Sequence, residues 1–490
     1  MKGETAAFRS EKKRLLLVIA NSRWLGKRHW NLFPYSALIL TRLLKEDFDF
    51  EILDANGENL TTGEAAERMR SWGPDAVLVA TQSVEYGVQY HEVARLAKEV
   101  RPDCTTVFGG VYATVLPEEA VKDPNVDFVF LWHAEERVGD FLEAVFSGAA
   151  DRLRTFPGLA FRDASGAEVL NPVESYISDV RVQVKPDYSR IDVRPYLVQE
   201  SDDYQSNAPD LCGNILTSYG CQYNCLFCAA RTISGRKVAF RPVADVLEEM
   251  EYLMNEHGVR YFIFHDDAFV ANRKRTRQML NAFIERQYNV RWKLVNVAAW
   301  NLDDELLSLL KAAGCEQLTI SVESGSQRVL KEIVRKPLKL EIVPPLVRKC
   351  RALGITIGAN FVFGFPGETW EEIRQTVRFA EQCDFDIAHF CIATPLPKTD
   401  LYELAREKGC LPADFSFTDP RFFGFGRAFL TTDEFTPFEL MVLRSYEWDR
   451  INFGTPEKLR KIAELMNLSV AELNEHRRLT RQRCGVHFIA

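Results

Sequence analysis

The stretch SYGCQYNCLFCAAR, residues 218–231, places Cys221, Cys225 and Cys228 within eight positions of a chain that has eleven cysteines in 490 residues. Soft thiolate ligands bind iron–sulfur clusters, zinc or copper(I). A structural zinc site normally uses four protein ligands in two spaced pairs, and no second Cys or His pair follows here at that spacing. A four-iron cluster that only transfers electrons uses four cysteines. Three cysteines therefore predict a cluster with one iron open to a small chelating molecule, and zinc is the alternative.

Strand-like and helix-like segments alternate around and after this stretch. The expected strands are NILTS, which precedes the cysteines, and YFIFHD, RWKLVNV, QLTISVE, TIGANFVFGF and IAHFCIATPL, which follow them. Helical periodicity in residues 242–257 and 369–383 separates successive strands, which is typical of parallel strands. Six such strands predict a partial (β/α)6 TIM-like barrel, open on one side, with its site at the rim formed by the carboxyl ends.

A second alternation occupies residues 14 to about 148, with expected strands RLLLVIA, EILDA, DAVLVAT, TTVFGG and DFVFLW. This pattern predicts a doubly wound, flavodoxin- or Rossmann-like domain whose ligand lies at the carboxyl ends of the strands. Candidate contact residues at those ends are Asn21, Thr81, Gln82, Ser83, Gly109, Gly110, Val111 and Tyr112. Because Gly109 and Gly110 lack side chains, the backbone there can approach a large flat ligand closely. A tight turn without a ligand is the alternative.

The chain is expected to divide into four parts. Residues 1–150 form the doubly wound domain, and 151–210 form a linker with a hairpin at residues 158–172. Residues 211–410 form the barrel, and 411–490 form a small helical C-terminal domain. Aromatic residues of the last part either close the open side of the barrel over a substrate or belong to the core, namely Phe422, Phe423, Phe425 and Trp448.

Composition narrows the classes of function. The chain is 46% apolar with a net charge of -8, and its early apolar run RLLLVIAN is too short to span a bilayer. Few, mostly isolated cysteines favour the reducing cytoplasm. No polybasic arm or RNA-binding signature is present, so nucleic acid is disfavoured and a small-molecule substrate is expected.

The cysteine spacing Cys-x3-Cys-x2-Cys after a first barrel strand resembles the radical S-adenosylmethionine (SAM) superfamily. The resemblance implies a [4Fe-4S] cluster on Cys221, Cys225 and Cys228, with SAM chelating the open iron. Further contacts with SAM are implied for Phe227 beside the adenine, Asp266 and Asp267 at the amino group, Ser321 and Glu323 at the ribose, and Asn360 in the segment GANFVFGFPGET. Taken alone, the two aspartates favour a helix cap and a salt-bridge partner over a ligand contact, and Glu323 could pair with a nearby arginine.

The N-terminal domain before this barrel resembles the cobalamin-binding domain of class B radical SAM enzymes, through FGGVYATVLPEEAV and NVDFVFLWHAEE. The latter departs from the usual Gly-Glu-Gly-Glu, which puts local contacts of that loop in doubt. No Asp-x-His-x-x-Gly occurs, so cobalamin is expected to lack a lower histidine ligand. The resemblance implies that the loop of Thr81 to Tyr86 faces the cobalt, with Tyr86 a candidate beside it. A ligand-free interaction domain is the alternative.

Together these resemblances imply a cobalamin-dependent radical SAM methyltransferase of natural-product or antibiotic biosynthesis. It would methylate an unactivated carbon, or a phosphinate phosphorus, through a 5'-deoxyadenosyl radical and methylcobalamin. A flavodoxin or ferredoxin is the expected electron donor. The alternatives are a cobalamin-dependent cyclase or ring-remodelling enzyme and a non-catalytic corrinoid-binding module. A methylthiotransferase is disfavoured because the N-terminal domain offers only Cys104.

Overall fold

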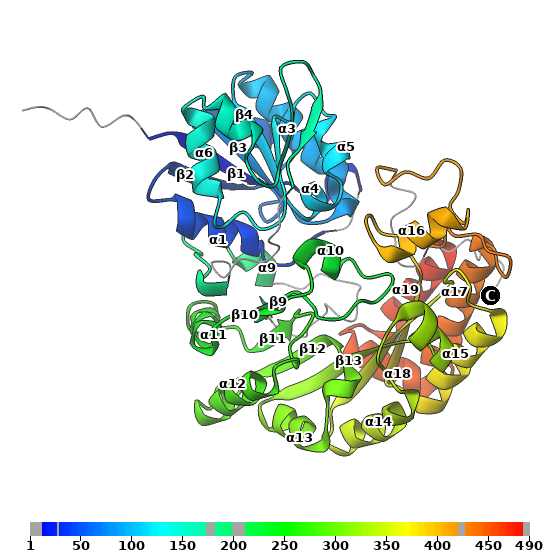
Figure 1. Cartoon of the computed structure of the whole chain (residues 1–490). Coiled ribbons are helices and arrows are strands. Elements are labelled where there is room, and N and C mark those ends of the chain that lie inside the picture. The colour runs from blue at the N-terminus through cyan, green and yellow to red at the C-terminus, as the bar shows by residue number, and fades with distance from the viewer. Residues whose placement is uncertain (1–11, 27–28, 173–181, 198–210, 420–426, 484–490) are drawn as a thin grey trace, which may run out of the picture. The chain divides into compact units, whose positions relative to one another are not determined.

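The computed structural model describes residues 12–26, 29–172, 182–197, 211–419 and 427–483. The chain divides into two compact units, Met1–Pro195 and Tyr196–Ala490, which we call the N-terminal and C-terminal units (Figure 1). Each unit contains a parallel sheet with helices packed against it, so the α/β class expected from the sequence is confirmed.

The N-terminal unit is built on a seven-stranded sheet of order β2-β1-β3-β4-β5-β6-β7. The parallel strands are β1 (Arg14–Ile19), β2 (Asp49–Asp54), β3 (Ala76–Thr81), β4 (Thr105–Gly110) and β5 (Phe128–Phe130). Their order, 2-1-3-4-5, is that of flavodoxin-like doubly wound folds, in which ligands bind beyond the carboxyl ends of the strands.

Helices cover both faces of this sheet (Figure 1). On one face α1 (Tyr35–Leu44) and α6 (Val138–Phe146) bury apolar side chains against the strands in one core cluster. On the other face α2 (Thr62–Trp72) and α3 (Gly87–Val100) pack together. The described residues also form the short helices η1 (Trp24–Gly26), η2 (Val84–Tyr86), α4 (Val111–Val115), α5 (Pro117–Val121) and α7 (Ala150–Arg154), and α9 (Arg194–Leu197) lies at the division between the two units.

The hairpin expected inside the linker belongs to the first sheet. Strands β6 (Leu159–Arg162) and β7 (Glu168–Leu170) pair with each other, and β6 also pairs antiparallel with β5 through Val129 and Ala160. The hairpin therefore extends the edge of the sheet, because its apolar face covers the end of the same core. The division between the two units falls after Pro195, whereas the sequence placed the end of the N-terminal domain at residue 150.

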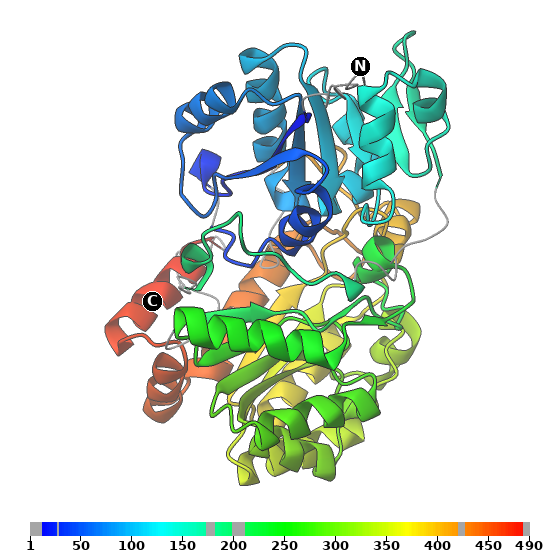
Figure 2. The same ribbon diagram turned by 90° about the vertical axis from the view of Figure 1, so that its left-hand side faces the viewer.

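The C-terminal unit contains six parallel strands in the order β15-β14-β13-β12-β11-β8. They are β8 (Cys212–Ile215), β11 (Tyr261–Phe264), β12 (Arg291–Val297), β13 (Cys315–Glu323), β14 (Thr356–Phe363) and β15 (Ile387–Ile392). The helices between them follow the outside of the sheet (Figure 2): α11 (Val243–His257), α12 (Arg273–Glu285), α13 (Asp304–Ala312), α14 (Val343–Ala352) and α15 (Trp370–Cys383). The expected partial barrel is confirmed, with β8 and β15 at its two edges.

Helix α17 (Pro437–Phe453) packs against the edge strand β15. The side-chain amide of Asn452 donates to the carbonyl oxygen of Ala388 and accepts from its N–H, both at 2.8 Å. This side chain gives the edge strand the bonds that a neighbouring strand would otherwise supply. The other C-terminal helices are α16 (Asp400–Glu407), α18 (Pro456–Leu465) and α19 (Val470–Arg483).

Trp448 on α17 is 8% exposed and packs edge-on against Phe453 at 5.0 Å, so it belongs to the core. The other three aromatic residues considered as a cover for the barrel, Phe422, Phe423 and Phe425, lie outside the described residues. No helix in the described part of the chain has the length and apolar character needed to cross a bilayer.

The two adjacent glycines that end β4 predict opposite responses to substitution. Gly110 has φ of +114°, and a Cβ there would lie 2.5 Å from the carbonyl oxygen of Thr81, whereas a Cβ on Gly109 would meet nothing within 4 Å. We expect Gly110→Ala to lower the free energy of unfolding by about 2 kcal/mol or more, through strain and steric overlap. Scanning calorimetry of the full chain measures this, with Gly109→Ala as the matched control. Equal melting temperatures for the two variants would contradict it.

Candidate functional site

The three cysteines lie on the loop after β8 and the short strand β9 (Ser218–Tyr219), which pairs with β10 (Ala239–Phe240). All three are free thiols, partly buried. The loop is held from two directions, because the N–H of Leu226 donates to the carbonyl of Val334 at 3.0 Å and the carbonyl of Leu226 accepts from the N–H of Leu401 at 2.9 Å. The loop therefore has a defined position at the carboxyl end of the first barrel strand.

Burial raises the pKa of all three thiols, that of Cys228 to about 12. Negative charge on Cys221 and Cys225 raises the pKa of Cys228 further, so the three sulfur atoms lie within electrostatic range of one another. Three buried thiolates need a cationic group to balance them, which fits an iron–sulfur cluster with one iron left to a non-protein ligand. Within the described ranges, no three His, Cys, Asp or Glu side chains are gathered as closely as a single metal ion requires.

The two aspartates after β11 differ in their surroundings. Asp266 is buried, and its carboxylate accepts bonds from the N–H and hydroxyl of Thr217 and from the hydroxyl of Ser218, the hydroxyl distances being 2.7 and 2.6 Å. These partners immediately precede the cysteine loop. Asp266 therefore positions the loop through its bonds to Thr217 and Ser218.

Asp267 is exposed, yet the surrounding protein and the neighbouring charge of Asp266 raise its pKa to about 6. Its charge acts on both Cys221 and Cys228. An accessible carboxylate with a raised pKa close to the thiols is the member of the acidic pair that can contact a ligand at the cluster.

The end of β13 carries Ser321, which is partly exposed, and Glu323, which is buried. Glu323 has φ of +69° and forms an ion pair with Lys336 at 2.7 Å. A basic partner for Glu323 was one of the two interpretations of the sequence. That partner is a lysine, thirteen positions further along the chain.

Strand β14 and the turn after it complete the rim. Asn360 is partly exposed and donates to the side-chain oxygen of Asn296 on β12 at 3.0 Å. The rings of Phe227 and Phe365 lie 5.8 Å apart, which joins the cysteine loop to the turn. Within this turn, Glu368 accepts bonds from the N–H groups of Gly364 and Phe365.

Sequence reasoning missed three residues that surround the cysteine loop: Tyr223, Trp300 and Lys336. The indole N–H of Trp300 donates to the hydroxyl of Tyr223 at 2.7 Å, and the ammonium of Lys336 lies 5.6 Å from the centre of the Trp300 ring. The spacing of these three residues along the chain does not indicate that their side chains lie together. Tyr223 offered the only signal, since it lies between two of the cysteines.

In the N-terminal unit, several side chains expected to contact a ligand are bonded inside the unit. The hydroxyl of Thr81 donates to the carbonyl of Gly109 at 2.9 Å, and the amide of Asn21 donates to the carbonyl of Leu60 at 3.1 Å. Tyr86 is 1% exposed, with its ring edge-on to Trp30 at 6.0 Å. These side chains shape the ends of the strands and do not project from them.

Tyr112 is likewise buried, and its hydroxyl is 2.8 Å from Nε2 of His91. The opposite ring nitrogen of His91, Nδ1, bonds the carboxylate of Asp123 at 2.5 Å. This chain of contacts joins α3, α4 and the segment after α5. Tyr112 therefore packs inside the N-terminal unit.

Five of the candidate residues at the ends of β3 and β4 are partly exposed, and most of them have small side chains or none. They are Gln82, Ser83, Gly109, Gly110 and Val111. The N–H groups of Gln82 and Ser83 both donate to the hydroxyl of Tyr90, at 2.9 and 3.0 Å, which fixes their loop. A Cβ on Gly109 would meet no atom within 4 Å, so there is open space beside this residue. A bare, fixed backbone beside open space fits a large flat ligand such as a corrin ring with its substituents.

Comparison with known proteins adds two family matches. Residues 215–380 match the radical SAM superfamily, and residues 25–142 match the B12-binding domain. The chain is 28% identical over 421 residues to cytidylyl-2-hydroxyethylphosphonate methyltransferase of Streptomyces wedmorensis, covering 79% of this chain and 76% of that protein. It is 26% identical over 366 residues to an anaerobic magnesium-protoporphyrin IX monomethyl ester cyclase of Rubrivivax gelatinosus, covering 74% and 63%.

Two solved structures share this fold. One is the radical SAM methyltransferase TsrM of Kitasatospora setae with cobalamin and a [4Fe-4S] cluster bound, at a TM-score of 0.67 and 21% identity over 81% of this chain and 76% of that one. The other is the cobalamin-dependent SAM radical enzyme OxsB with aqua-cobalamin and SAM bound, at a TM-score of 0.71 and 14% identity over 96% and 72%.

Glu368 predicts a pH dependence of stability. Burial raises its pKa to about 8, from 4.5 in a free side chain, so its contribution to stability is complete below about pH 4.5 and declines as pH rises to 8. We expect the free energy of unfolding of the wild-type protein to fall by a few kcal/mol between pH 5 and pH 8, relative to that of Glu368→Gln, whose side chain cannot ionise. Chemical denaturation at both pH values measures the difference.

Glu372, on the next helix, provides the matched control for that experiment. The bond from Arg328 lowers its pKa to about 2, so its contribution is complete above about pH 4.5 and is lost only in acid. Between pH 5 and pH 8, the free energy of unfolding of Glu372→Gln should therefore change with pH by the same amount as that of wild type. If the free energy of unfolding of Glu368→Gln also changes with pH by the same amount as that of wild type, Glu368 is ionised in the folded protein.

Proposed function

We propose that this chain is a cobalamin-dependent radical SAM methyltransferase and that it methylates an unactivated carbon or a phosphinate phosphorus of a small natural-product-type molecule. The observation that carries the proposal is the pairing of a B12-binding domain with a radical SAM barrel whose first strand is followed by three free cysteines. The likeness to cytidylyl-2-hydroxyethylphosphonate methyltransferase supports a polar, anionic substrate of this class.

When bound, the cluster and SAM supply a carbon-centred radical, and cobalamin supplies the methyl group. The chain's own residues bind and orient these groups. Cys221, Cys225 and Cys228 would hold the cluster. Asp267 is the carboxylate available to the amino group of SAM, since it is accessible and acts electrostatically on two of the thiols. Ser321 would contact the ribose.

Phe227 would lie beside the adenine, since its ring packs on Phe365 at the same rim. Asn360 pairs in register with Ser321 on one side and with His389 on the other, and all three side chains are partly exposed. Polar groups at neighbouring positions of adjacent strands are suited to orienting a small polar substrate. In the N-terminal unit, Gln82, Ser83 and the backbone of Gly109 and Gly110 would bind cobalamin.

A cobalamin-dependent cyclase is the second candidate, because relatives from two organisms with 26% and 28% identity are named as anaerobic magnesium-protoporphyrin IX monomethyl ester cyclases. Both candidates need the same cofactors and differ in whether the product gains a methyl group. Either one needs a low-potential electron donor such as a flavodoxin or ferredoxin. We place the enzyme in a reducing cytoplasm, since all ten cysteines in the described ranges are free thiols.

Transfer of a labelled methyl group tests the proposal without knowledge of the substrate. We expect the anaerobically reconstituted protein, given reductant, cobalamin and SAM with a deuterated methyl group, to produce labelled methylcobalamin and 5'-deoxyadenosine, both detectable by mass spectrometry. Cys225→Ala should lose the cluster absorption and at least a hundredfold of the 5'-deoxyadenosine, and should retain bound cobalamin. A wild-type protein that forms neither product would instead be a non-catalytic corrinoid-binding module.

The open space beside Gly109 leads to a separate prediction for cobalamin. A valine there would place two methyl groups in the space, with no clash inside the protein at its Cβ. We expect Gly109→Val to weaken cobalamin binding at least tenfold in equilibrium dialysis while the melting temperature of the cobalamin-free protein changes little. Unchanged affinity would place cobalamin away from the end of β4.

A further inference from the structure

We propose that Tyr90 is a positioning residue for cobalamin, on which it acts through the backbone of the loop after β3. Its hydroxyl holds that backbone so that the carbonyl oxygen of Gln82 accepts a hydrogen bond from an amide side chain of the corrin ring. The inference rests on the cobalamin site of the proposed function. It adds a residue that the sequence did not indicate, and it names the part of cobalamin that this loop recognises.

The hydroxyl of Tyr90 holds two consecutive peptide groups. The N–H of Gln82 donates to it at 2.9 Å, and the N–H of Ser83 donates to it at 3.0 Å. Tyr90 lies on α3, so its side chain reaches back to a loop that precedes its own helix. One phenol oxygen therefore fixes the direction of both peptide planes between Thr81 and Ser83.

Tyr90 holds the loop firmly because its own side chain is held. It is 2% exposed, and its ring centre lies 5.8 Å from that of Tyr112. Tyr112 bonds His91, and it packs so closely on Gly87 that a Cβ there would lie 3.0 Å from its ring. In such a close-packed interior the hydroxyl of Tyr90 has one position relative to α3.

The direction of the two N–H groups determines that of two carbonyl groups. The described backbone contains only trans peptides, in which the C=O and the N–H of one plane point in opposite directions. Because both N–H groups point at Tyr90, the carbonyl oxygens of Thr81 and Gln82 point away from it. The carbonyl oxygen of Thr81 lies beside Gly110, where a Cβ would approach it to 2.5 Å.

The carbonyl oxygen of Gln82 is available to a ligand. No backbone N–H and no side chain in the described ranges donates a hydrogen bond to it, and Gln82 is partly exposed. The preceding residue, Thr81, pairs with Gly110, so this acceptor lies at the same strand ends as the open space beside Gly109. A carbonyl oxygen accepts and does not donate, so the ligand group that suits it is a hydrogen-bond donor.

Cobalamin carries donors of this kind. Amide side chains surround the edge of its corrin ring, and each primary amide has two N–H donors. A carbonyl oxygen that is already held in one direction binds such a donor without a further cost of ordering the loop. Without the hydroxyl of Tyr90 both peptide planes are free to rotate, and the carbonyl oxygen of Gln82 loses its fixed direction.

Two corrins that differ in these donors test the inference. Cobinamide keeps the amide side chains of cobalamin and lacks its nucleotide, whereas heptamethyl cobyrinate has methyl esters in place of the amides. We expect Tyr90→Phe to weaken the binding of cobinamide at least tenfold in equilibrium dialysis, because the acceptor is no longer held. The binding of heptamethyl cobyrinate, which has no N–H donor, should change less than twofold. A role of Tyr90 in stability alone predicts equal effects on both corrins.

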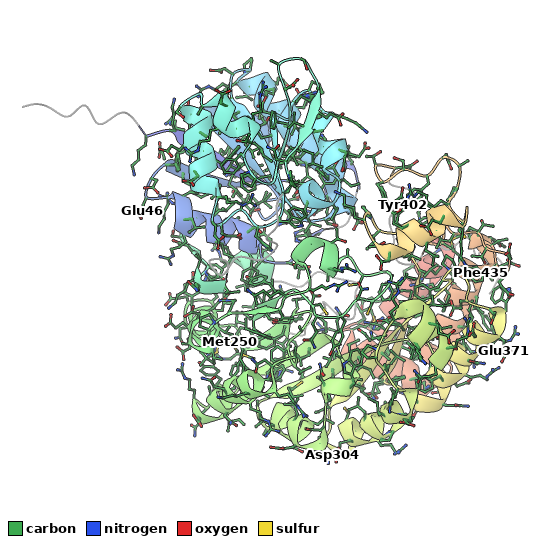
Figure 3. All side chains as sticks on the ribbon, in the orientation of Figure 1. Glu46, Met250, Asp304, Glu371, Tyr402 and Phe435 are labelled. Atoms are coloured by element: carbon green, nitrogen blue, oxygen red, sulfur yellow. The ribbon has the colours of Figure 1, made fainter. Side chains whose placement is uncertain are left out.

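Thr106→Val is the matched control, since it also removes a buried hydroxyl that accepts from a backbone N–H. Thr106 is buried, and its hydroxyl accepts from the N–H of Asp127 at 3.1 Å. It lies near the start of β4. Figure 3 labels Glu46, three residues before β2, which marks the same amino ends of the parallel strands. Thr106→Val should leave the affinity for both corrins unchanged, and melting temperatures of the ligand-free variants compare their losses of stability.

A second pair of variants keeps the test decisive if Tyr90→Phe does not fold. Gln82→Gly and Gln82→Ala both remove the side chain, but only glycine gives the backbone additional freedom. We expect Gln82→Gly to bind cobinamide at least threefold more weakly than Gln82→Ala does, and to bind heptamethyl cobyrinate equally well. Equal affinities of the two variants for cobinamide would contradict the inference.

The outcomes also separate this inference from the proposed function. A wild-type protein that binds neither aquacobalamin nor cobinamide overturns both. If wild type binds them and Tyr90→Phe binds cobinamide equally well, or loses affinity for both corrins alike, the inference is wrong and the cobalamin site of the proposed function stands.

Discussion

The carboxylate of Asp266 is the interaction on which the arrangement of the C-terminal unit depends. It accepts bonds from the backbone and hydroxyl of Thr217 and from the hydroxyl of Ser218, and burial raises its pKa. The guanidinium of Arg275 also bonds the hydroxyl of Thr217, which fixes that residue from a second direction. The chain leaves this cage and enters the cysteine loop within three residues. A loop that presents three thiols without a fourth needs such an anchor, because no fourth cysteine ligand closes the site.

Buried ionisable side chains surround the cysteine loop on several sides, each with a specific partner. Glu323 is paired with Lys336, Glu368 accepts two backbone N–H groups, and Asp266 accepts hydroxyl bonds. A buried ion pair contributes little net stability, and perturbed carboxyl pKa values concentrate at functional sites. Their concentration at the carboxyl ends of β11, β13 and β14 identifies this rim as the working end of the barrel, in agreement with the general rule for parallel α/β barrels.

The candidate binding surface of the N-terminal unit differs from this rim, because few side chains project from the ends of its strands. Thr81, Tyr86 and Tyr112 turn into the unit, and the strand ends are left with the glycines of β4 and a loop held by the hydroxyl of Tyr90. A flat, fixed backbone suits a cofactor that brings its own reactive atom. The protein then needs to bind and orient it, and supplies no acid, base or nucleophile.

The sequence by itself determined both fold classes, the positions of most strands and the loop that carries the three cysteines. These follow from period, order and spacing along the chain, which local physical chemistry controls. It did not assign the hairpin at residues 159–170 to the first sheet, because the pairing of Val129 with Ala160 joins segments thirty residues apart.

Tertiary structure alone decided which candidate side chains are accessible and which are buried. Asp266 and Asp267 are adjacent and chemically identical, yet one is buried in a hydroxyl cage and the other is accessible beside the thiols. Lys336 contacts Glu323 and Trp300 because it follows a π-helical turn, which the pattern of apolar residues in the sequence does not predict. The physical reason is common to both cases. The direction of a side chain and the charges around it depend on contacts between strands and loops that are distant in sequence, whereas the class of the fold depends on the alternation of apolar and polar residues within each segment.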